Sequence, residues 1–395
     1  MASEFDKNLN ISYVEDNLEP PSRKLILKHC ICSYIVYLVI YFILIYNPFF
    51  SGYFNPQLRA LYITAYVCYI FLAPTIYFTA KPKTIYKSHN IEICNYFLRI
   101  FKQIFNKKTI LKADYQSVLK SFIPSYYEKQ ALMLIFIKVF FGCLMTSFLS
   151  NDINAIKNIV ENYKNIFYDI NSYFSFDYLK QIFSANGNFF YSSTITILFS
   201  IDVLFFAMGY LTECAFLKNK IRTVDTSLFG IFFCLICYPP FNKTTTTFIG
   251  WNQSDNPDFL EALPPKLNIT FRIFALFFLL IYALASVALF TKASNLTNRG
   301  TVSIFPYNIV RHPAYISKNM FWVLTTIPAF VFPLNSPYFN LREYIIRSLL
   351  IVLSLLLWIF IYYMRAITEE RHLMQDPEYQ EYAKKVRWRF IPFII

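Results

Sequence analysis

The sequence predicts an all-α, polytopic membrane protein: a bundle of about eight transmembrane helices, with both termini cytoplasmic and amphipathic helices at the membrane surface. Of the 395 residues, 56% are hydrophobic and only 15% are charged, and there are 44 Phe and 31 Tyr. A soluble protein of this length has too little interior to bury so much apolar surface. Several segments also run for about 20 residues with at most one charge, which is the length that crosses a hydrocarbon core of about 30 Å.

Eight segments have this character, and the fifth is the weakest of them. In the fifth, the sequence Cys237-Tyr238-Pro239-Pro240 interrupts the apolar run, so we expect a short, kinked or irregular crossing there. The eight expected spans are 25–46, 58–78, 131–149, 189–211, 227–241, 271–291, 312–332 and 344–364.

The distribution of positive charge predicts the orientation of the chain. With eight crossings and the N-terminus inside, the inner segments hold most of the 37 Lys and Arg residues, as the positive-inside rule requires. The net charge of +13 therefore lies on the inner face, next to anionic lipid headgroups, and does not indicate a nucleic-acid partner. The basic and aromatic stretch 81–129 predicts amphipathic helices on that cytoplasmic interface.

The sequence predicts no metal site and contains no glycine-rich phosphate loop. Cys234 and Cys237 have the spacing of a ligand pair but lack a second pair, so we interpret them as small packing residues. A charged side chain inside a membrane span costs several kcal/mol unless it is paired, and such residues often have a function. Asp202 and Lys138 are such residues, and for each the alternatives are a pairing role within the bundle and a functional role.

Two polar clusters flank the last two expected spans. The first, from Arg311 to Tyr315, lies at the start of the seventh span, and the second, Glu369-Glu370, follows the eighth. Consecutive antiparallel spans return to the same face of a membrane, so we expect these clusters to meet at one cytosolic rim.

The residues around these clusters form a compound pattern that resembles the isoprenylcysteine carboxyl methyltransferase family and the related membrane phospholipid methyltransferases. The resemblance covers 292–395 and extends plausibly back to 189, so we expect a methyltransferase-like catalytic region at 189–395. The region 1–188, with three expected spans, has no identified role. The matching residues are Tyr307, Arg311, His312, Pro313 and Tyr315, then Arg365 and Glu369, then the tail from Tyr379 to Pro392.

The resemblance implies that S-adenosylmethionine is held at the cytosolic mouth by Tyr307, by His312-Pro313-Ala314-Tyr315 and by Glu369. It also implies that Arg365 contacts the acceptor, a lipid or lipidated molecule that enters from the bilayer. In the family, the segment that matches 299–302 also contacts the cofactor, but this stretch shares little with the family beyond Gly300. The residues after Tyr315 also depart from it, since Ser317 replaces a common glycine and is followed by the unusual Lys318-Asn319.

The chemistry of the side chains agrees with this expectation. Arg311 and His312 can bind the carboxylate of the cofactor, and Glu369 and Glu370 can bind its ammonium or its ribose hydroxyls. Tyr307 and Tyr315 offer ring faces to a sulfonium. Pro313 suits the first turn of a helix whose N-terminus faces an anion.

Two rival interpretations remain open. Membrane sterol reductases are similar over the same region and bind NADPH, but they usually follow the tyrosine with Gly-Asp and carry Arg-Asp-Glu. This chain has Ser317-Lys318 and Thr368-Glu369-Glu370 at those places. The other rival is a lipid-binding protein of the same fold without turnover.

Overall fold

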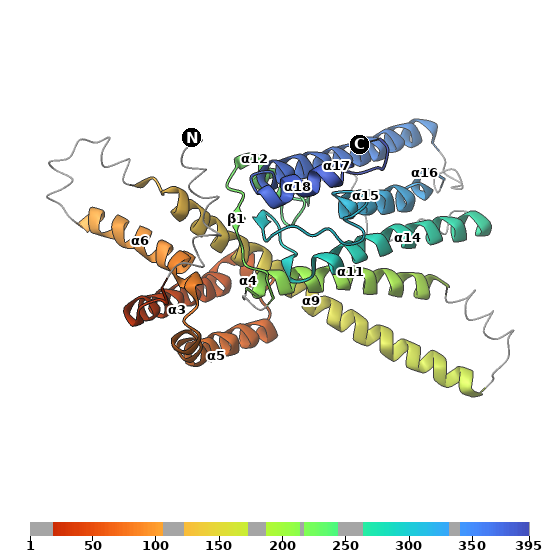
Figure 1. Cartoon of the computed structure of the whole chain (residues 1–395). Helices are drawn as coiled ribbons and strands as arrows, with labels where there is room; N and C mark the ends of the chain where they lie inside the picture. Colours follow the sequence, from red (N-terminus) through yellow and green to blue (C-terminus); the bar gives the residue numbers. More distant parts are fainter. Residues whose placement is uncertain are drawn as a thin grey trace. The chain divides into compact units, whose positions relative to one another are not determined.

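The computed structural model describes residues 19–105, 122–172, 187–213, 217–243, 264–331 and 340–394 (Figure 1). In these ranges the regular structure is helical except for the two-residue strands β1 (Thr223–Val224) and β2 (Thr297–Asn298). The chain divides into two compact units, Met1–Ser147 and Phe148–Ile395, and the division falls within a single long helix, α9. The predicted boundary at residue 188 concerns function and stays a prediction.

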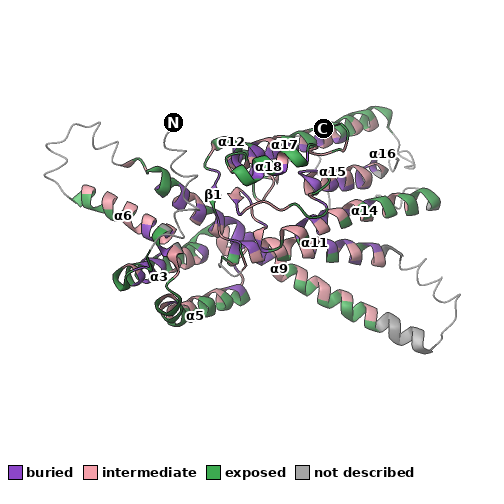
Figure 2. Ribbon diagram, in the orientation of Figure 1, coloured by how far each residue is buried: buried purple, intermediate pink, exposed green. Residues whose placement is uncertain are grey.

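Six of the described helices are long and apolar enough to cross a membrane, which confirms an all-α, multi-pass membrane protein. Much of their surface is exposed (green in Figure 2). It includes large apolar side chains such as Phe71 and Leu349, as expected where lipid replaces water. The six helices are α3 (Arg23–Tyr46), α5 (Pro56–Ala80), α9 (Tyr126–Ser172), α11 (Gly187–Leu211), α14 (Pro265–Leu289) and α17 (Leu341–Leu373).

The fifth and seventh expected spans form shorter helices, so the count of eight crossings stays a prediction. Helix α12 (Leu228–Leu235) has 8 residues, and the chain then turns toward the Pro239-Pro240 pair, where proline cannot continue a helix. Helix α15 (Pro313–Thr326) has 14 residues and is followed by the short α16 (Pro328–Val331). At 1.5 Å per residue, α15 extends about 21 Å, less than a hydrocarbon core.

The first unit contains α3, α5, the short α4 (Pro48–Ser51), the 3-10 turn η1 (Lys83–Lys87) and α6 (His89–Phe105). Helix α6 has the expected amphipathic pattern: Glu92, Asn95 and Arg99 lie at helical spacing on one face, and the exposed Phe97, Leu98 and Phe101 lie on the other. The rest of the expected amphipathic stretch, 106–121, lies outside the described residues. A position of α6 on the membrane surface stays a prediction.

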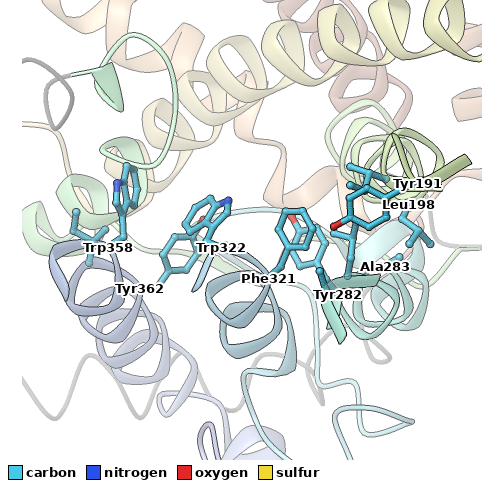
Figure 3. Packing of buried hydrophobic residues seen from close by; sticks show 12 residues of the cluster. Tyr191, Leu198, Tyr282, Ala283, Phe321, Trp322, Trp358 and Tyr362 are labelled. Carbon is cyan, nitrogen blue, oxygen red and sulfur yellow. The ribbon is translucent and has the colours of Figure 1, made fainter. Parts of the chain in front are cut away.

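In the second unit α11, α14, α15 and α17 pack in sequence, each against the next (Figure 1). Figure 3 shows the aromatic core that joins them, with Tyr282 on α14, Phe321 and Trp322 on α15, and Trp358 and Tyr362 on α17. Strands β1 and β2 pair antiparallel, Thr223 opposite Asn298, which brings together the chain that leaves α11 and the chain that leaves α14. These two helices therefore end on the same side of the unit.

Candidate functional site

The loop before α15 is held in place by the C-terminal tail. The backbone N–H of Arg311 donates to the carbonyl of Trp388 at 2.9 Å, and that of His312 donates to the carbonyl of Arg389 at 2.9 Å. The Tyr382 hydroxyl, on α18 (Pro377–Lys385), donates to the Tyr307 carbonyl at 2.7 Å. The tail therefore lies beside the loop and fixes the start of α15.

Glu370 is the ionic centre of this arrangement. Its carboxylate accepts hydrogen bonds from Arg311 Nε at 2.8 Å and Nη2 at 3.3 Å, and from Arg389 Nε at 2.8 Å. It also contacts His312 Nε2 at 3.0 Å. The Glu370 and Arg311 side chains are only 4% and 8% exposed, so the pair is almost fully withdrawn from solvent. The two clusters expected to meet at one rim are thus in direct contact.

Glu369 faces a different partner from its neighbour Glu370. The Tyr315 hydroxyl donates to Glu369 Oε2 at 2.5 Å, and the ring of Tyr315 stacks on that of His312 at 5.3 Å. Burial and the negative charge of Glu369 raise the pKa of the Tyr307 hydroxyl, so that hydroxyl stays protonated at neutral pH. Glu369 is half-buried, whereas Glu370 is buried and fully occupied by cations.

Arg365 lies one turn before Glu369, surrounded by aromatic rings. Its guanidinium lies over the rings of Tyr315, Tyr238 and Tyr362, at 5.2, 5.6 and 5.9 Å from the ring centroids. It donates to Asn295 Oδ1 at 2.5 Å. In the described chain, no carboxylate lies within ion-pairing distance of Arg365.

Several residues around Arg365 were not foreseen from the sequence. Tyr362 had a usable signal, because it lies three residues before Arg365 and so on the same helix face. No such signal marks Asn295 and Tyr238 in the sequence, because Tyr238 lies in the segment after α12 and Asn295 in the segment between α14 and β2. Asn295 is held by two tyrosine hydroxyls, with its backbone N–H bonded to Tyr210 at 2.8 Å and its side-chain amide to Tyr238 at 2.9 Å.

Arg299 holds this connection in place. Its buried guanidinium donates to the carbonyls of Gly209 at 2.7 Å and Asn219 at 2.8 Å, and to Ser294 Oγ at 2.8 Å. These bonds give Arg299 a structural role, and contact of the stretch 299–302 with a cofactor stays a prediction. Gly300 has a positive φ of 88°, and a Cβ there would meet the Arg222 guanidinium at 2.7 Å.

The rim of the site carries a second ionic contact, between Arg222 and α18. Arg222 Nη1 lies 2.7 Å from Asp376 Oδ2 and 2.5 Å from Glu378 Oε2, and Asn298 Nδ2 donates to Asp376 at 2.9 Å. Burial acts to raise the pKa of Asp376, but the bonds and charge of Arg222 outweigh it and hold that pKa below its usual value. Arg222 therefore joins the rim, whereas Asp225 accepts from the Ser227 N–H at 2.9 Å and helps to start α12.

Asp202 pairs with a neighbouring helix, as the structural alternative required. It accepts hydrogen bonds from the hydroxyls of Tyr282, at 2.6 Å, and Ser286, both on α14. Nearby, the ammonium of Lys318 on α15 lies 5.3 Å from the ring centroids of Phe199, Tyr282 and Trp322. Lys138 lies in the other unit, half-buried in α9.

The cysteine pair lies next to Arg365, with which the Cys237 side chain forms a hydrogen bond. Cys234 is buried, and Cys237 Sγ lies 3.4 Å from the carbonyl of Phe233, one turn earlier. Across the described ranges, no group of three or more His, Cys, Asp or Glu side chains is arranged to hold a metal ion.

Comparison with known proteins gives no relative for this chain: no family model, curated protein or solved structure matches it.

Proposed function

We propose that this protein transfers a methyl group from S-adenosylmethionine to a lipid or lipidated acceptor at the ends of α15 and α17. The resemblance of 292–395 to membrane methyltransferases suggests the chemistry. The observation that carries the proposal is the contact of Tyr315 with Glu369 beside Arg365, which joins three residues of that resemblance in one cluster.

The donor set suits this cofactor. The carboxylate of Glu369, bound to a single tyrosine hydroxyl, has remaining acceptor capacity for an ammonium or a ribose hydroxyl. The stacked rings of His312 and Tyr315 provide a face for a sulfonium or for adenine. Tyr307, near Glu369, adds a hydroxyl, and Pro313 and Ala314 form the first turn beneath these rings.

The contacts divide the predicted cofactor residues into two groups. Arg311 and Glu370 bind each other, so in this proposal they hold the loop and tail around the site and do not touch the cofactor. Direct contacts then come from Tyr307, His312, Tyr315 and Glu369. This division differs from the sequence-based expectation, which gave all of them the same role.

The reaction depends on the position of the acceptor and on the exclusion of water more than on acid–base chemistry. The bound cofactor supplies an electrophilic methyl group on sulfur. The chain must hold the acceptor atom in line with that methyl at about 3 Å and keep water out. Arg365 fits this task, because it is buried among tyrosines and can fix an anionic acceptor by charge-assisted hydrogen bonds.

The proposal includes a cytosolic location for the site. Eight crossings with both termini inside put the loop before α15, the end of α17 and the tail on the inner face, as the positive-inside rule favours. The direct contacts between tail and loop agree with this arrangement, because they require both segments on one side.

Ligand-induced thermal stabilisation tests the proposal. The purified full chain in detergent should be stabilised by S-adenosylhomocysteine, because a ligand that binds only the folded state raises the melting temperature. Stabilisation by NADPH alone would favour the reductase interpretation, and stabilisation by neither would favour a non-catalytic lipid-binding protein.

A pair of variants on one helix makes the test specific. Glu369→Ala should lose the stabilisation by S-adenosylhomocysteine, whereas Glu343→Ala, at the exposed opposite end of α17, should keep it. Equal stabilisation of both variants would remove Glu369 from the cofactor site. Incubation of membranes with cofactor that carries a labelled methyl group would then identify the acceptor.

A further inference from the structure

In the second unit, Lys318 forms no ion pair with an acidic side chain of the described residues. Lys318 lies three residues after Tyr315, on the same face of α15 and about one turn further from the mouth. Its ammonium faces the rings of Phe199, Tyr282 and Trp322, each at 5.3 Å. Within the described chain it has no ion pair, and no hydrogen-bond acceptor receives its three N–H donors.

Arg365 is in the same situation on the facing helix. Its neighbours include three tyrosine rings, the Cys237 side chain and the Asn295 amide oxygen, and none of these forms an ion pair with it. The two cations belong to one aromatic cluster, because the ring of Tyr362 lies 5.4 Å from that of Tyr315 and 5.7 Å from that of Trp322. Arg365 and Lys318 thus contact the same aromatic cluster, and Lys318 lies about one helical turn further along α15 than Tyr315, the ring that Arg365 contacts.

Asp202, near this pair, offsets only one of its two positive charges. Its two carboxylate oxygens are bound to the hydroxyls of Tyr282 and Ser286, and Tyr282 turns its ring face to Lys318. Two cations and one carboxylate leave one positive charge uncompensated in an aromatic, poorly hydrated interior. Such a charge is costly unless an anion binds there. Glu369, the next carboxylate toward the mouth, bonds Tyr315 and is assigned to the cofactor in the proposed function.

We propose that Lys318 and Arg365 together bind the anionic group of a lipid acceptor, a carboxylate or a phosphodiester, on the interior side of Tyr315. Lys318 is then a specificity residue: it admits lipids with a single negative charge and disfavours neutral ones. Beneath the ammonium, the Tyr282 hydroxyl donates a hydrogen bond to Asp202. This inference rests on the proposed function, but it adds a residue that the methyltransferase resemblance does not assign.

Native mass spectrometry of the full chain in detergent tests the inference directly. The probes are oleate as a carboxylate, lysophosphatidylglycerol as a phosphodiester lipid, methyl oleate as the neutral match, and inorganic phosphate as a free anion. At least one of the two anionic lipids should bind more tightly than methyl oleate. Lys318→Gln should weaken that binding about 10-fold or more, because it removes a charge-assisted hydrogen bond.

Two further variants separate recognition from folding. Lys318→Arg keeps the positive charge and should retain most of the affinity, and Lys266→Gln, at the exposed start of α14, should bind as the wild type does.

The results that overturn the inference are distinct from those that overturn the proposed function. Methyl oleate bound as tightly as oleate, or unchanged affinity in Lys318→Gln, removes the anion site. Phosphate binding that depends on Lys318 as strongly as lipid binding does would assign the site to a free anion instead. Lipid affinity is measured both with and without S-adenosylhomocysteine. The anion site can therefore be tested even if that compound does not bind.

Discussion

Replacement of Glu370 by glutamine should release the tail from the loop before α15. In the wild type, the Glu370 carboxylate neutralises the buried Arg311 and also binds His312 and Arg389. Glutamine keeps the shape and one acceptor oxygen but removes the charge, which leaves the Arg311 guanidinium buried without a counter-ion. Loss of one partner of a buried ion pair typically costs about 3–5 kcal/mol. Because glutamine retains one acceptor, we expect about 3 kcal/mol, the lower end.

Amide hydrogen exchange measures this effect at two defined positions. The N–H groups of Arg311 and His312 donate to Trp388 and Arg389, so their protection reports how firmly the tail is bound. A loss of about 3 kcal/mol corresponds to a protection factor lower by about two orders of magnitude. The matched control is Glu369→Gln, one residue earlier, which loses only a tyrosine hydroxyl bond and should leave both amides protected. Unchanged exchange in Glu370→Gln would refute the idea that this carboxylate holds the tail.

Three further predictions concern packing, pH and turnover. Gly209→Ala should lower the free energy of unfolding by about 2 kcal/mol or more, because its Cβ would lie 1.9 Å from a backbone carbonyl. Thermal unfolding in detergent measures this, with Gly52→Ala as the control at an open position; equal melting temperatures for both variants would contradict it. The pKa of Asp376 is lowered in the folded state, so its contact with Arg222 stabilises the protein above the unfolded carboxyl pKa and is lost as pH falls through the folded one. The melting temperature of Asp376→Asn should therefore lie below that of the wild type near neutral pH, and the gap should close only in acid; a gap that closes near neutral pH would speak against this contact. Arg365→Ala should leave S-adenosylhomocysteine affinity unchanged but slow methyl transfer by about 10- to 100-fold, and an unaltered rate would remove it from the acceptor site.

The sequence was sufficient for the class of the protein and for most of its membrane-spanning helices. Hydrophobic length is a local property, so the segments that became α3, α5, α14 and α17 could be recognised without knowledge of their neighbours. The fifth segment was correctly singled out as irregular, because proline cannot continue a helix whatever surrounds it. The interruption of the seventh segment was not foreseen: α15 ends at Thr326, just before Pro328, and the short α16 follows.

The meeting of the two polar clusters was also predictable, because an antiparallel hairpin returns its ends to one face. The sequence did not predict which partner each of the two glutamates binds. Glu369 and Glu370 are adjacent and chemically identical, but successive residues point about 100° apart around a helix. One therefore meets Tyr315, and the other meets Arg311.

The sequence by itself thus determined a membrane bundle and a convergent polar rim, because both follow from local composition and the order of the segments. Only the tertiary structure decided that Asn295 and Tyr238 surround Arg365, and that the ammonium of Lys318 lies among three aromatic rings. These contacts join segments far apart in the chain. Their geometry depends on how α11, α14, α15 and α17 pack, and no local pattern encodes that packing.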